Sequence, residues 1–576
     1  MKILLTAINA KYIHSNLAIY SLRTCAGEYS ENVELAEFTI NNPKDYILEE
    51  IYKKNPDVLC LSCYIWNIDY VESVAKEFHK ICPDVPIWVG GPEVSYEVRT
   101  FLEKNRFIEG IMIGEGEETF KELCRHYIDK DIALSDIKGL AYRKEDKSIS
   151  VTQPRGIMDM SKIPFCYNTM EDFSNRIIYY ESSRGCPFSC SYCLSSVDKT
   201  LRFRDIKLVK KELKFFIDQN VPQIKFVDRT FNCNHKHAMA IWQFIKENDN
   251  GITNFHFEIS ADLINEEELA LISDMRPGLI QLEIGVQSTN DTTIREIHRT
   301  MNLERLKDIV AKIQKGGNIH EHLDLIAGLP YEGYESFKKS FDEIYELKPN
   351  QLQLGFLKVL KGSYMYEHAK EYGIVYHDGP PYEVLKTNWL SFDEVLKIKQ
   401  VEEMLEVYYN SGQFEITMKV LEKLFDSAFD LFRQLGEYYE QKGYFGMNHS
   451  RIRRCEILLE FVKAYESTRE YVHIIEQALI YDLYYRENCK SRPSWACDVA
   501  EFKHMTHYYC KNGKLSHVEP FLYDFPGKDV NSIDVIPQKL SEPIWVLFHY
   551  DKRDPLDNQA YVEHVDYVEV PEKGRK

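Results

Sequence analysis

The 576-residue sequence predicts an α/β protein with three parts in succession: an open parallel sheet, a partial (β/α)6 barrel and a mainly helical C-terminal domain. Apolar strand-like runs alternate with amphipathic helical segments over about the first 360 residues. Beyond residue 375 these runs give way to long helical patterns. We expect domains at 1–135, 171–375 and 376–576, with a linker at 136–170.

The apolar content, the cysteine count and the net charge of the chain limit the classes of protein to which it can belong. Apolar residues make up 44% of the chain, which is normal for a globular protein with a sizeable core. No apolar run is long enough for a membrane span, and Met1–Thr6 enters a strand without a signal-peptide pattern. The 14 cysteines lack a disulfide framework, so we expect a reducing, cytoplasmic setting. The net charge of −19 argues against binding polyanions over a wide surface.

The first part is predicted from five strand-helix units, which form an open parallel sheet. Ser15 or Asn16 can cap the first helix, and Pro43–Lys54 and Ile68–Ile81 are further helices. Ligands of such sheets bind at the carboxyl ends of the strands. The expected strands are Lys2–Ile8, Val33–Thr39, Asp57–Trp66, Pro86–Val89 and Phe107–Ile113. Their carboxyl ends carry Asn9–Asn16, Ser62–Asn67, Gly90–Ser95 and Gly114–Glu117.

A polar connection with a hairpin, Lys138–Lys162, leads to six further β-α units, which predict the barrel. Catalytic residues of such barrels lie at the carboxyl ends of the strands. The expected strands are Arg176–Glu181, Gln223–Val227, Asn254–Ile259, Leu279–Ile284, His320–Ile326 and Gln351–Leu357. The expected helices are Asp205–Gln219, Ala238–Glu247, Glu266–Met275, Leu303–Gly316 and Glu335–Leu347.

The barrel begins with a compact cysteine motif, in which Cys186, Cys190 and Cys193 have C-x3-C-x2-C spacing. In a chain with 14 cysteines this pattern arises by chance roughly 0.008 times. Three thiolates can bind three irons of a four-iron cluster and leave the fourth iron open, whereas ferredoxin-type clusters use four cysteines. Zinc is the alternative, but zinc needs a fourth ligand, and Cys233 is too far downstream for a compact knuckle.

This motif resembles the signature loop of the radical S-adenosylmethionine (SAM) enzymes. The tracts that end at Asn232, Ser288 and Pro330 resemble strand ends of the same family's TIM-like barrel. The resemblance implies that the three cysteines are the catalytic ligands of a [4Fe-4S] cluster whose open iron binds SAM. It also implies that Tyr192 lies against the adenine and Gly285 close to SAM. Expected polar contacts to SAM are Glu258, Ser260 and Gln287.

The first part resembles the cobalamin-binding, Rossmann-like domain that precedes many radical SAM barrels. The matching turns are Gly90–Glu93 and Gly114–Glu117, whose glycines let the backbone approach a flat corrin. The motif Asp-x-His-x-x-Gly is absent around His14, so we expect no protein histidine on cobalt. A Rossmann-like domain that binds nothing, or a nucleotide, is the alternative. The expected cobalamin contacts are Asn9, Tyr12, His14, Ser62, Gly90, Gly91, Glu93, Gly114, Glu115 and Gly116.

The last part resembles a C-terminal domain of undefined function that accompanies cobalamin-type radical SAM proteins. A boundary is expected at Pro380-Pro381, and residues 500–570 return to short strands such as Trp545–His549. Cys233–His237 is predicted to cap a helix rather than bind metal. The expected helices are Ser391–Asn410, Phe414–Lys442, Ile452–Tyr471 and His473–Tyr485. The basic clusters, interpreted as solvated faces, are Arg451, Arg453 and Arg454, and Arg486, Lys490 and Arg492. The cysteines expected to be free thiols are Cys489, Cys497 and Cys510.

The resemblance implies a radical reaction. SAM is cleaved reductively to methionine and a 5′-deoxyadenosyl radical, which removes a hydrogen from a substrate carbon. With cobalamin, the leading expectation is methylation of a small molecule or peptide, supported by an electron donor of the flavodoxin or ferredoxin type. The alternatives are modification of tRNA or a nucleoside, a cobalamin-dependent cyclisation or rearrangement, and a non-catalytic sensor.

Overall fold

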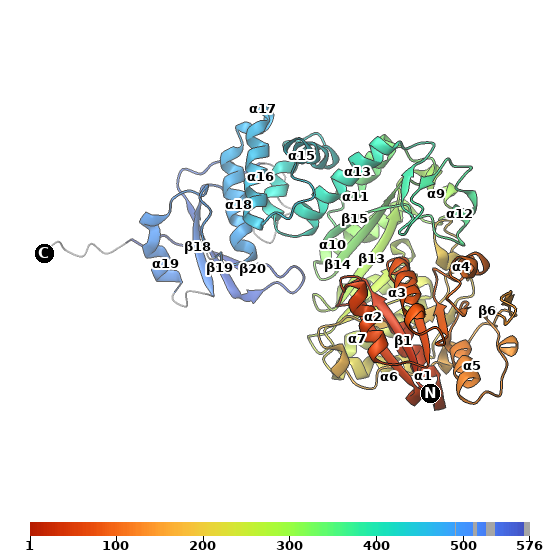
Figure 1. The fold of residues 1–576 in the computed structure, drawn as a ribbon. Helices are drawn as coiled ribbons and strands as arrows, with labels where there is room; N and C mark the ends of the chain where they lie inside the picture. Colours follow the sequence, from red (N-terminus) through yellow and green to blue (C-terminus); the bar gives the residue numbers. More distant parts are fainter. Residues whose placement is uncertain (490, 511–514, 526–535, 570–576) are drawn as a thin grey trace.

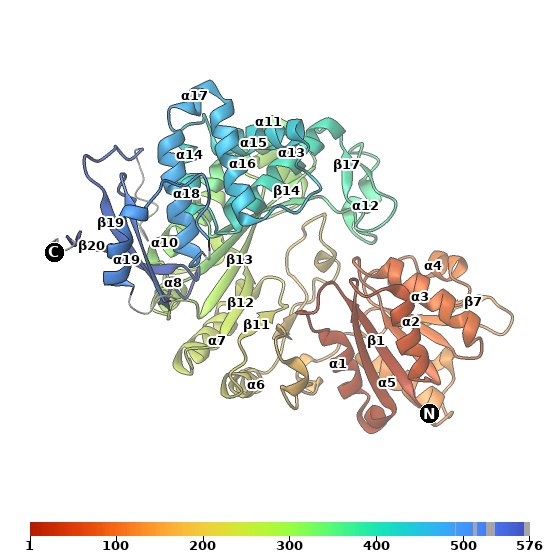
Figure 2. The ribbon, with the colours of Figure 1, turned by 60° about the vertical axis from the view of Figure 1, so that its left-hand side comes forward.

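The structure is a computed structural model that describes residues 1–489, 491–510, 515–525 and 536–569. It confirms the predicted fold class, with two parallel α/β units followed by a mainly helical region (Figure 1). The barrel lies between the N-terminal sheet and the C-terminal helices, and two views of the ribbon agree on this arrangement (Figure 2). Among the described residues, none of the helices is both long and apolar enough to cross a membrane.

The first sheet has seven strands in the order β2-β1-β3-β4-β5-β6-β7. Strands β1 to β5 are parallel, and the β6–β7 hairpin adds to β5 in antiparallel fashion. This hairpin falls within the expected linker, so the sheet extends to Val151 rather than ending near 135. The strands are β1 (Ile3–Asn9), β2 (Val33–Thr39), β3 (Val58–Ser62), β4 (Ile87–Gly90), β5 (Gly110–Met112), β6 (Leu140–Arg143) and β7 (Ile149–Val151).

Helices cover both faces of this sheet, so only its edges are left for ligands. Leu4 and Ile8 pack on the face shared with α2 and α3, while Ile3 and Leu5 pack on the face shared with α1 and α5. Asn16 caps α1 as predicted, since its side chain accepts from the Ile19 N–H at 3.3 Å. The helices are α1 (Leu17–Cys25), α2 (Lys44–Lys53), α3 (Ile68–Ile81), α4 (Val98–Lys104) and α5 (Glu117–Ile128).

The second sheet is the partial barrel, with six parallel strands in the order β15-β14-β13-β12-β11-β8. The strands are β8 (Ile178–Tyr180), β11 (Gln223–Phe226), β12 (Asn254–Ile259), β13 (Ile280–Gln287), β14 (His320–Ala327) and β15 (Gln351–Phe356). The predicted helices are α6 (Ile206–Asp218), α7 (His235–Glu247), α8 (Glu266–Ser273), α10 (Leu303–Gly316) and α11 (Tyr334–Tyr345). The sequence analysis missed α9 (Asp291–Glu296) and α12 (Tyr364–His368).

A small hairpin, β16 (Val375–Tyr376) and β17 (Val384–Lys386), holds Pro380-Pro381 at its tip. The N–H of Val384 donates to the Leu357 carbonyl at 2.9 Å, so this segment still packs on the barrel. The expected division near residue 375 therefore falls inside a hairpin that is bonded to the barrel.

The C-terminal region is mainly helical and ends in a small antiparallel sheet of the order β18-β19-β20. One continuous helix over Phe414–Lys442 was a wrong prediction, because Ser427 starts a new helix by capping the Asp430 N–H at 3.3 Å. The helices are α13 (Phe392–Leu405), α14 (Glu415–Glu422), α15 (Ala428–Lys442), α16 (Arg451–Ala464), α17 (Glu466–Arg469), α18 (Val472–Arg486) and α19 (Lys503–Tyr509). The strands are β18 (Ser516–Phe521), β19 (Ile544–Arg553) and β20 (Ala560–Val565).

A buried carboxylate joins two of these helices. Asp482 of α18 is 3% exposed and accepts the backbone N–H groups of Ile416 and Thr417 at 2.9 and 2.8 Å. It also accepts the Thr417 hydroxyl at 2.6 Å. Asp482 thus caps the first turn of α14 from a distant part of the chain.

We expect Asp482→Ala to lower the stability of the C-terminal region by about 3 kcal/mol, because three buried donors lose their acceptor. Calorimetry of the full-length protein should show a lowered unfolding temperature. The matched control is Asp498→Ala, since Asp498 is exposed and accepts only a local N–H. Equal unfolding temperatures for the two variants would contradict this role of Asp482.

Candidate functional site

The three-cysteine loop is closed by a short antiparallel pair of strands, β9 (Ser183–Arg184) and β10 (Arg202–Phe203). Gly185 begins the loop with a φ of +91°, and a Cβ there would lie 2.4 Å from the Thr200 carbonyl oxygen. Only glycine can therefore occupy this position without moving the backbone. The Cys186 N–H donates to the Asp198 carbonyl at 3.2 Å, which closes the loop further.

The loop brings the three cysteine thiols together. Cys186 and Cys190 are buried and Cys193 is half-buried. Burial raises the pKa of the Cys186 thiol, and the nearby Cys193 and Cys190 raise it further. No three His, Cys, Asp or Glu side chains in the described part of the chain surround a single metal-ion position. A four-iron cluster would instead meet each thiolate at a different iron.

A buried arginine lies beside these thiols. The Nη1 atom of Arg299 is 3.9 Å from the Cys190 sulfur and 3.5 Å from the Tyr192 hydroxyl, and Nη2 donates to the Gly285 carbonyl. Its Nε is buried and has no hydrogen-bond partner among the described residues. A buried cation with an unsatisfied N–H is a place for an anionic group. The sequence analysis missed Arg299, since no motif surrounds it.

The other expected SAM contacts lie at the carboxyl ends of β12 and β13. Burial raises the pKa of Glu258 to about 7, although Arg229, 4.0 Å away, opposes this shift. Gln287 has a φ of +75°, and its buried Oε1 has no hydrogen-bond partner in the part of the chain that the structure describes. The Ser260 hydroxyl donates to Asp262 at 2.7 Å, so it already serves a turn. The structure thus places these residues at the ends of neighbouring strands, and their roles toward SAM stay predictions.

Charged side chains line the inner face of the barrel sheet. Lys225 donates to Glu283 at 2.9 Å, and the His256 Nε2 is 3.0 Å from the same carboxylate. On β14, the His322 Nε2 is 3.1 Å from Asp324. Burial opposes ionisation of Glu283, but His256 and Lys225 hold the pKa of this carboxyl well below its usual range. A face of this kind suits a polar substrate rather than an apolar one.

One buried carboxylate positions the chain that enters the loop. Asp228 accepts the Ser182 N–H at 2.9 Å and the hydroxyls of Ser182 and Ser183, both at 2.6 Å. The Ser182 hydroxyl also lies 2.9 Å from the His237 Nε2.

Asn234 accepts the His237 N–H at 3.1 Å, which confirms the predicted helix cap. The expected reading of Cys233–His237 as a cap therefore holds.

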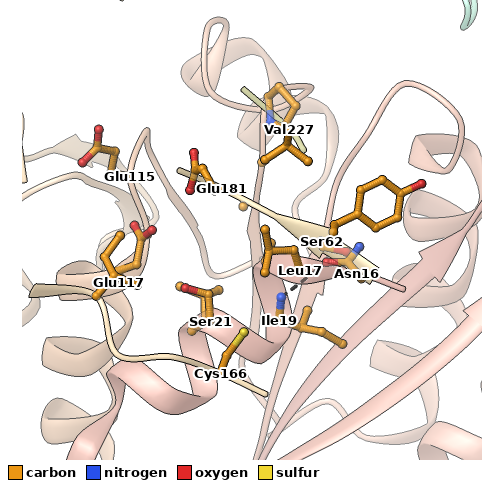
Figure 3. Close-up of a pocket in the computed structure, with 18 of the residues that line it drawn as sticks. Asn16, Leu17, Ile19, Ser21, Ser62, Glu115, Glu117, Cys166, Glu181 and Val227 are labelled. Carbon is orange, nitrogen blue, oxygen red and sulfur yellow. Dashed lines mark hydrogen bonds between the residues drawn. The ribbon is translucent and has the colours of Figure 1, made fainter. Parts of the chain in front are cut away.

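A cavity of about 850 Å³ lies between the carboxyl edge of the first sheet and the barrel. This volume is near the upper end of the roughly 300–1,000 Å³ range of ligand sites. In Figure 3, Glu115 and Glu117 lie on one side of the cavity, Ser62 and Asn16 lie on the other, and Glu181 of the barrel lies between them. Eight of the expected cobalamin contacts line it: Asn9, His14, Ser62, Gly90, Gly91, Gly114, Glu115 and Gly116. The barrel contributes walls that the sequence analysis did not assign, among them Tyr179, Tyr180, Glu181, Arg184 and Val227.

Two expected contacts, Tyr12 and Glu93, do not line the cavity. Tyr12 is 63% exposed and its ring lies 4.9 Å from the Arg176 guanidinium carbon. Glu93 accepts the hydroxyl of Tyr382, because the turn that carries it contacts the β16–β17 hairpin. Gly91 lies on the same edge of the sheet and does line the cavity. It has a φ of +124°, and a Cβ there would lie 2.3 Å from the Cys63 carbonyl oxygen, so this position requires glycine.

His14 is the one histidine among the residues that line the cavity in the described chain. Its Nδ1 is 2.7 Å from the Tyr179 hydroxyl of β8. Burial, followed by Lys11 and Lys225, lowers the pKa of His14, so the imidazole is neutral near pH 7. Its expected role as a cobalamin contact stays a prediction.

Ion pairs join the sheet edge to the cysteine segment. Arg184 bonds Glu181 and Glu117, both at 2.7 Å, and Arg202 pairs with Glu115. These contacts connect the Gly114–Glu117 turn directly to the two strands that close the cysteine loop. The cavity and the loop are therefore held at a fixed position relative to each other.

Comparison with protein families divides the chain into three consecutive matches. The family model "B12 binding domain" matches residues 3–124 and "Radical SAM superfamily" matches 180–344. "Protein of unknown function (DUF4080)" matches 370–533. The order of these matches agrees with the resemblance seen in the sequence.

Curated relatives share the first two parts. The "Cobalamin-dependent radical SAM methyltransferase TokK" of Streptomyces tokunonensis is 25% identical over 321 residues, which are 50% of this chain and 45% of TokK. The "Uncharacterized methyltransferase PH0819" of Pyrococcus horikoshii is 26% identical over 395 residues, 66% of this chain and 82% of that protein. The chain thus spans less than half of the length of TokK.

Solved structures share the fold. The apo form of the "Cobalamin-dependent S-adenosylmethionine radical enzyme OxsB" matches with a TM-score of 0.58 and 16% identity, over 84% of this chain and 80% of OxsB. The radical SAM methyltransferase TsrM from Kitasatospora setae, with cobalamin and a [4Fe-4S] cluster bound, matches with a TM-score of 0.55 and 16% identity, over 66% of this chain and 79% of TsrM. This chain thus contains a B12-binding domain followed by a radical SAM domain, and the proteins that it resembles include cobalamin-dependent radical SAM enzymes.

Proposed function

We propose that this protein is a cobalamin-dependent radical SAM enzyme that methylates a carbon atom of a small molecule or peptide. The observation that carries this proposal is the cavity between the first sheet and the strand that enters the three-cysteine loop. Both cofactor sites then open onto the same side of the barrel, where the inner face can hold a substrate.

The three cysteines are the proposed ligands of the [4Fe-4S] cluster. When bound, the cluster supplies the electron that cleaves SAM. Arg299 places a positive charge beside Cys190, and its Nε lacks a partner among the described residues, so it is the proposed partner of the SAM carboxylate. The Tyr192 ring packs beside Cys190 and is the proposed stacking partner of the adenine. Burial raises the pKa of Glu258 to about 7, so near pH 7 its protonated and ionised forms are both populated and it can donate or accept a hydrogen bond at the ribose.

The cavity is the proposed cobalamin site. When bound, cobalamin supplies the methyl group that is transferred. The turns around Gly91 and Gly114 bring backbone, rather than side chains, to the cavity. Apolar walls that include Leu5, Ile19 and Leu22 exclude water from the reacting face.

The charged inner face of the barrel favours a polar substrate. TsrM has been solved with a tryptophan substrate, and TokK is named a methyltransferase, which supports a small molecule or peptide and methyl transfer. Cyclisation is the second candidate, since a magnesium-protoporphyrin IX monomethyl ester cyclase of Rubrivivax gelatinosus is 22% identical over 341 residues. Lys225, Glu283 and His256 oppose a large apolar substrate there. An RNA substrate and a non-catalytic sensor are the less supported alternatives. The proposed electron donor is a flavodoxin or a ferredoxin.

The test is anaerobic reconstitution with iron, sulfide, cobalamin and methyl-labelled SAM, with dithionite as reductant and fractions of cell extract as substrate. We expect 5′-deoxyadenosine and S-adenosylhomocysteine together, with label appearing in one small compound or peptide. Formation of 5′-deoxyadenosine without transfer of label to any fraction would favour cyclisation. Absence of SAM cleavage in the cluster-loaded protein would contradict both enzymatic proposals.

The anaerobically prepared protein should contain one [4Fe-4S] cluster, because the sequence has a single cysteine triplet of suitable spacing. Replacing Cys186, Cys190 or Cys193 by Ala should remove the charge-transfer absorbance of the cluster and abolish SAM cleavage. Cys489→Ala and Cys510→Ala are the controls and should keep both. Iron and sulfide near eight of each per chain would show that a second cluster exists.

Tyr192 is expected to affect SAM binding and not cluster assembly. Loss of a stacking ring weakens binding by about 1–2 kcal/mol, so Tyr192→Ala should bind SAM about tenfold less tightly with unchanged cluster absorbance. Tyr192→Phe keeps the ring and loses only the hydroxyl near Arg299, so it should bind SAM nearly as the original protein does. Unchanged affinity in Tyr192→Ala would refute the stacking role.

Bound cob(II)alamin should have no protein imidazole on cobalt. His14 already bonds the Tyr179 hydroxyl, and it lacks the carboxylate partner that orients ligating histidines. The electron paramagnetic resonance spectrum should therefore show no nitrogen hyperfine splitting from a protein ligand. Clear splitting that disappears in His14→Ala but persists in Tyr179→Phe would establish the opposite.

A further inference from the structure

A second cavity, far from the cofactor site, lies in the C-terminal region. Its volume is about 370 Å³, and it is lined by three arginines together with Gln413, Glu487 and Asn558. The arginines are Arg451 of α16, Arg486 of α18 and Arg553 of β19. In the sequence, Arg451 and Arg486 belong to two separate basic clusters that were interpreted as solvated faces, and Arg553 belongs to neither. We propose that this cavity, the arginine cavity, binds the phosphate group of a small phosphorylated molecule.

The arginines are held in place by the ends of the elements around them. Arg451 donates through Nη2 to the Asp482 carbonyl at 2.7 Å, and Arg553 through Nη1 to the Arg486 carbonyl at 2.8 Å. Arg486 donates through Nη1 to the Asp557 carbonyl at 2.6 Å. Each guanidinium is thus oriented by a backbone oxygen and needs no ligand to fix its position.

Two of the arginines still have donors to offer. The Arg451 Nε is buried, so Arg451 contributes its charge rather than a free donor. For Arg486 and Arg553, every hydrogen bond that the described chain gives is made through Nη1. Their Nε and Nη2 groups therefore remain for a ligand. Converging guanidinium N–H groups match the several oxygens of a phosphate better than a single carboxylate.

The charge balance at the arginine cavity is positive in a protein whose net charge is −19. Glu487 is the one carboxylate on its wall in the described chain, lies 3.3 Å from Arg451 and is 63% exposed. Behind the wall, burial raises the pKa of Asp482 to about 6 and that of Glu415 to about 8, which lessens the negative charge nearby. On the wall itself, three cations face one exposed carboxylate, which favours an anionic ligand.

A small ligand fits better than a nucleic acid. The neighbouring Arg453 is paired with Glu460 at 2.6 Å and with Glu456 at 3.1 Å, so it does not extend the positive surface. Arg492 is paired with the buried Glu519, and Lys490 lies outside the described residues. The described surface therefore offers one arginine cavity and not the row of cations that an RNA backbone requires.

The test uses equilibrium dialysis of the full-length protein with radiolabelled inorganic phosphate at constant ionic strength. We expect one saturable site per chain, weakened about tenfold or more in Arg486→Ala and in Arg553→Ala. Phenyl phosphate should displace the label, and phenol should not. The matched control is Arg469→Ala, since Arg469 is an exposed arginine of the same region that also donates to a backbone carbonyl. Unfolding temperatures of all variants are measured alongside, and Arg486→Lys keeps the charge if Arg486→Ala proves unstable.

Two results would overturn the proposal. One is the absence of saturable phosphate binding, or binding that the cavity variants and Arg469→Ala share equally. The other is tight, steeply salt-dependent binding of tRNA that is lost in the cavity variants, which would make this surface an RNA-binding one. Neither result depends on the iron–sulfur cluster or on cobalamin, so this proposal can fail while the proposed function stands, and the reverse.

Discussion

The structure depends on a set of partly buried ion pairs that join the edge of the first sheet to the start of the barrel. Glu37 pairs with Arg176 with side chains 8% and 13% exposed, and Glu117 pairs with Arg184 with side chains 8% and 21% exposed. Burying such charges costs hydration energy, so they are stable only in the geometry that satisfies each one. A shift of the sheet against the barrel would leave a carboxylate without its arginine, and this penalty favours a single arrangement of the two parts.

These ion pairs determine the positions of both the cavity and the cysteine loop. Arg184 precedes Cys186 by two residues, and Asp228 fixes the two serines before it. The turn that pairs with Arg184 and Arg202 also forms one wall of the cavity. A corrin in the cavity would therefore face a loop whose distance is set by bonds across the interface, which is what transfer between two cofactors needs.

The sequence was sufficient for the features that depend on local patterns. Alternating apolar runs predicted the eleven parallel strands of the two α/β units, and a single spacing predicted the cysteine loop. Glycine turns predicted most of one cavity wall because glycine marks a backbone that must come close. The missed features are those set by contacts between distant residues. Arg299 reaches Cys190 from the segment between α9 and α10, more than 100 residues later in the chain. Glu93 bonds Tyr382 because a hairpin 289 residues away packs there.

In the C-terminal region, too, the features that depend on contacts between distant residues were not predicted from the sequence. The break between α14 and α15 depends on Ser427 and on Asp482, whose carboxylate reaches α14 from a helix 65 residues later. Likewise, the order of residues in the sequence did not show which members of the two basic clusters lie close together in the fold. Folding places Arg451, Arg486 and Arg553 on one wall and Arg453 among carboxylates, so only the structure separates a binding site from a solvated face.

The central claim is that one chain holds cobalamin between the first sheet and the barrel, next to a cluster on the three cysteines. The most direct measurement is a crystal structure of the anaerobically reconstituted protein with anomalous difference maps at the cobalt and iron absorption edges. The account predicts a cobalt peak inside the cavity beside the Gly91 and Gly114 turns, and an iron peak bonded to Cys186, Cys190 and Cys193. A cobalt peak outside this cavity, or iron held by other cysteines, would contradict the account.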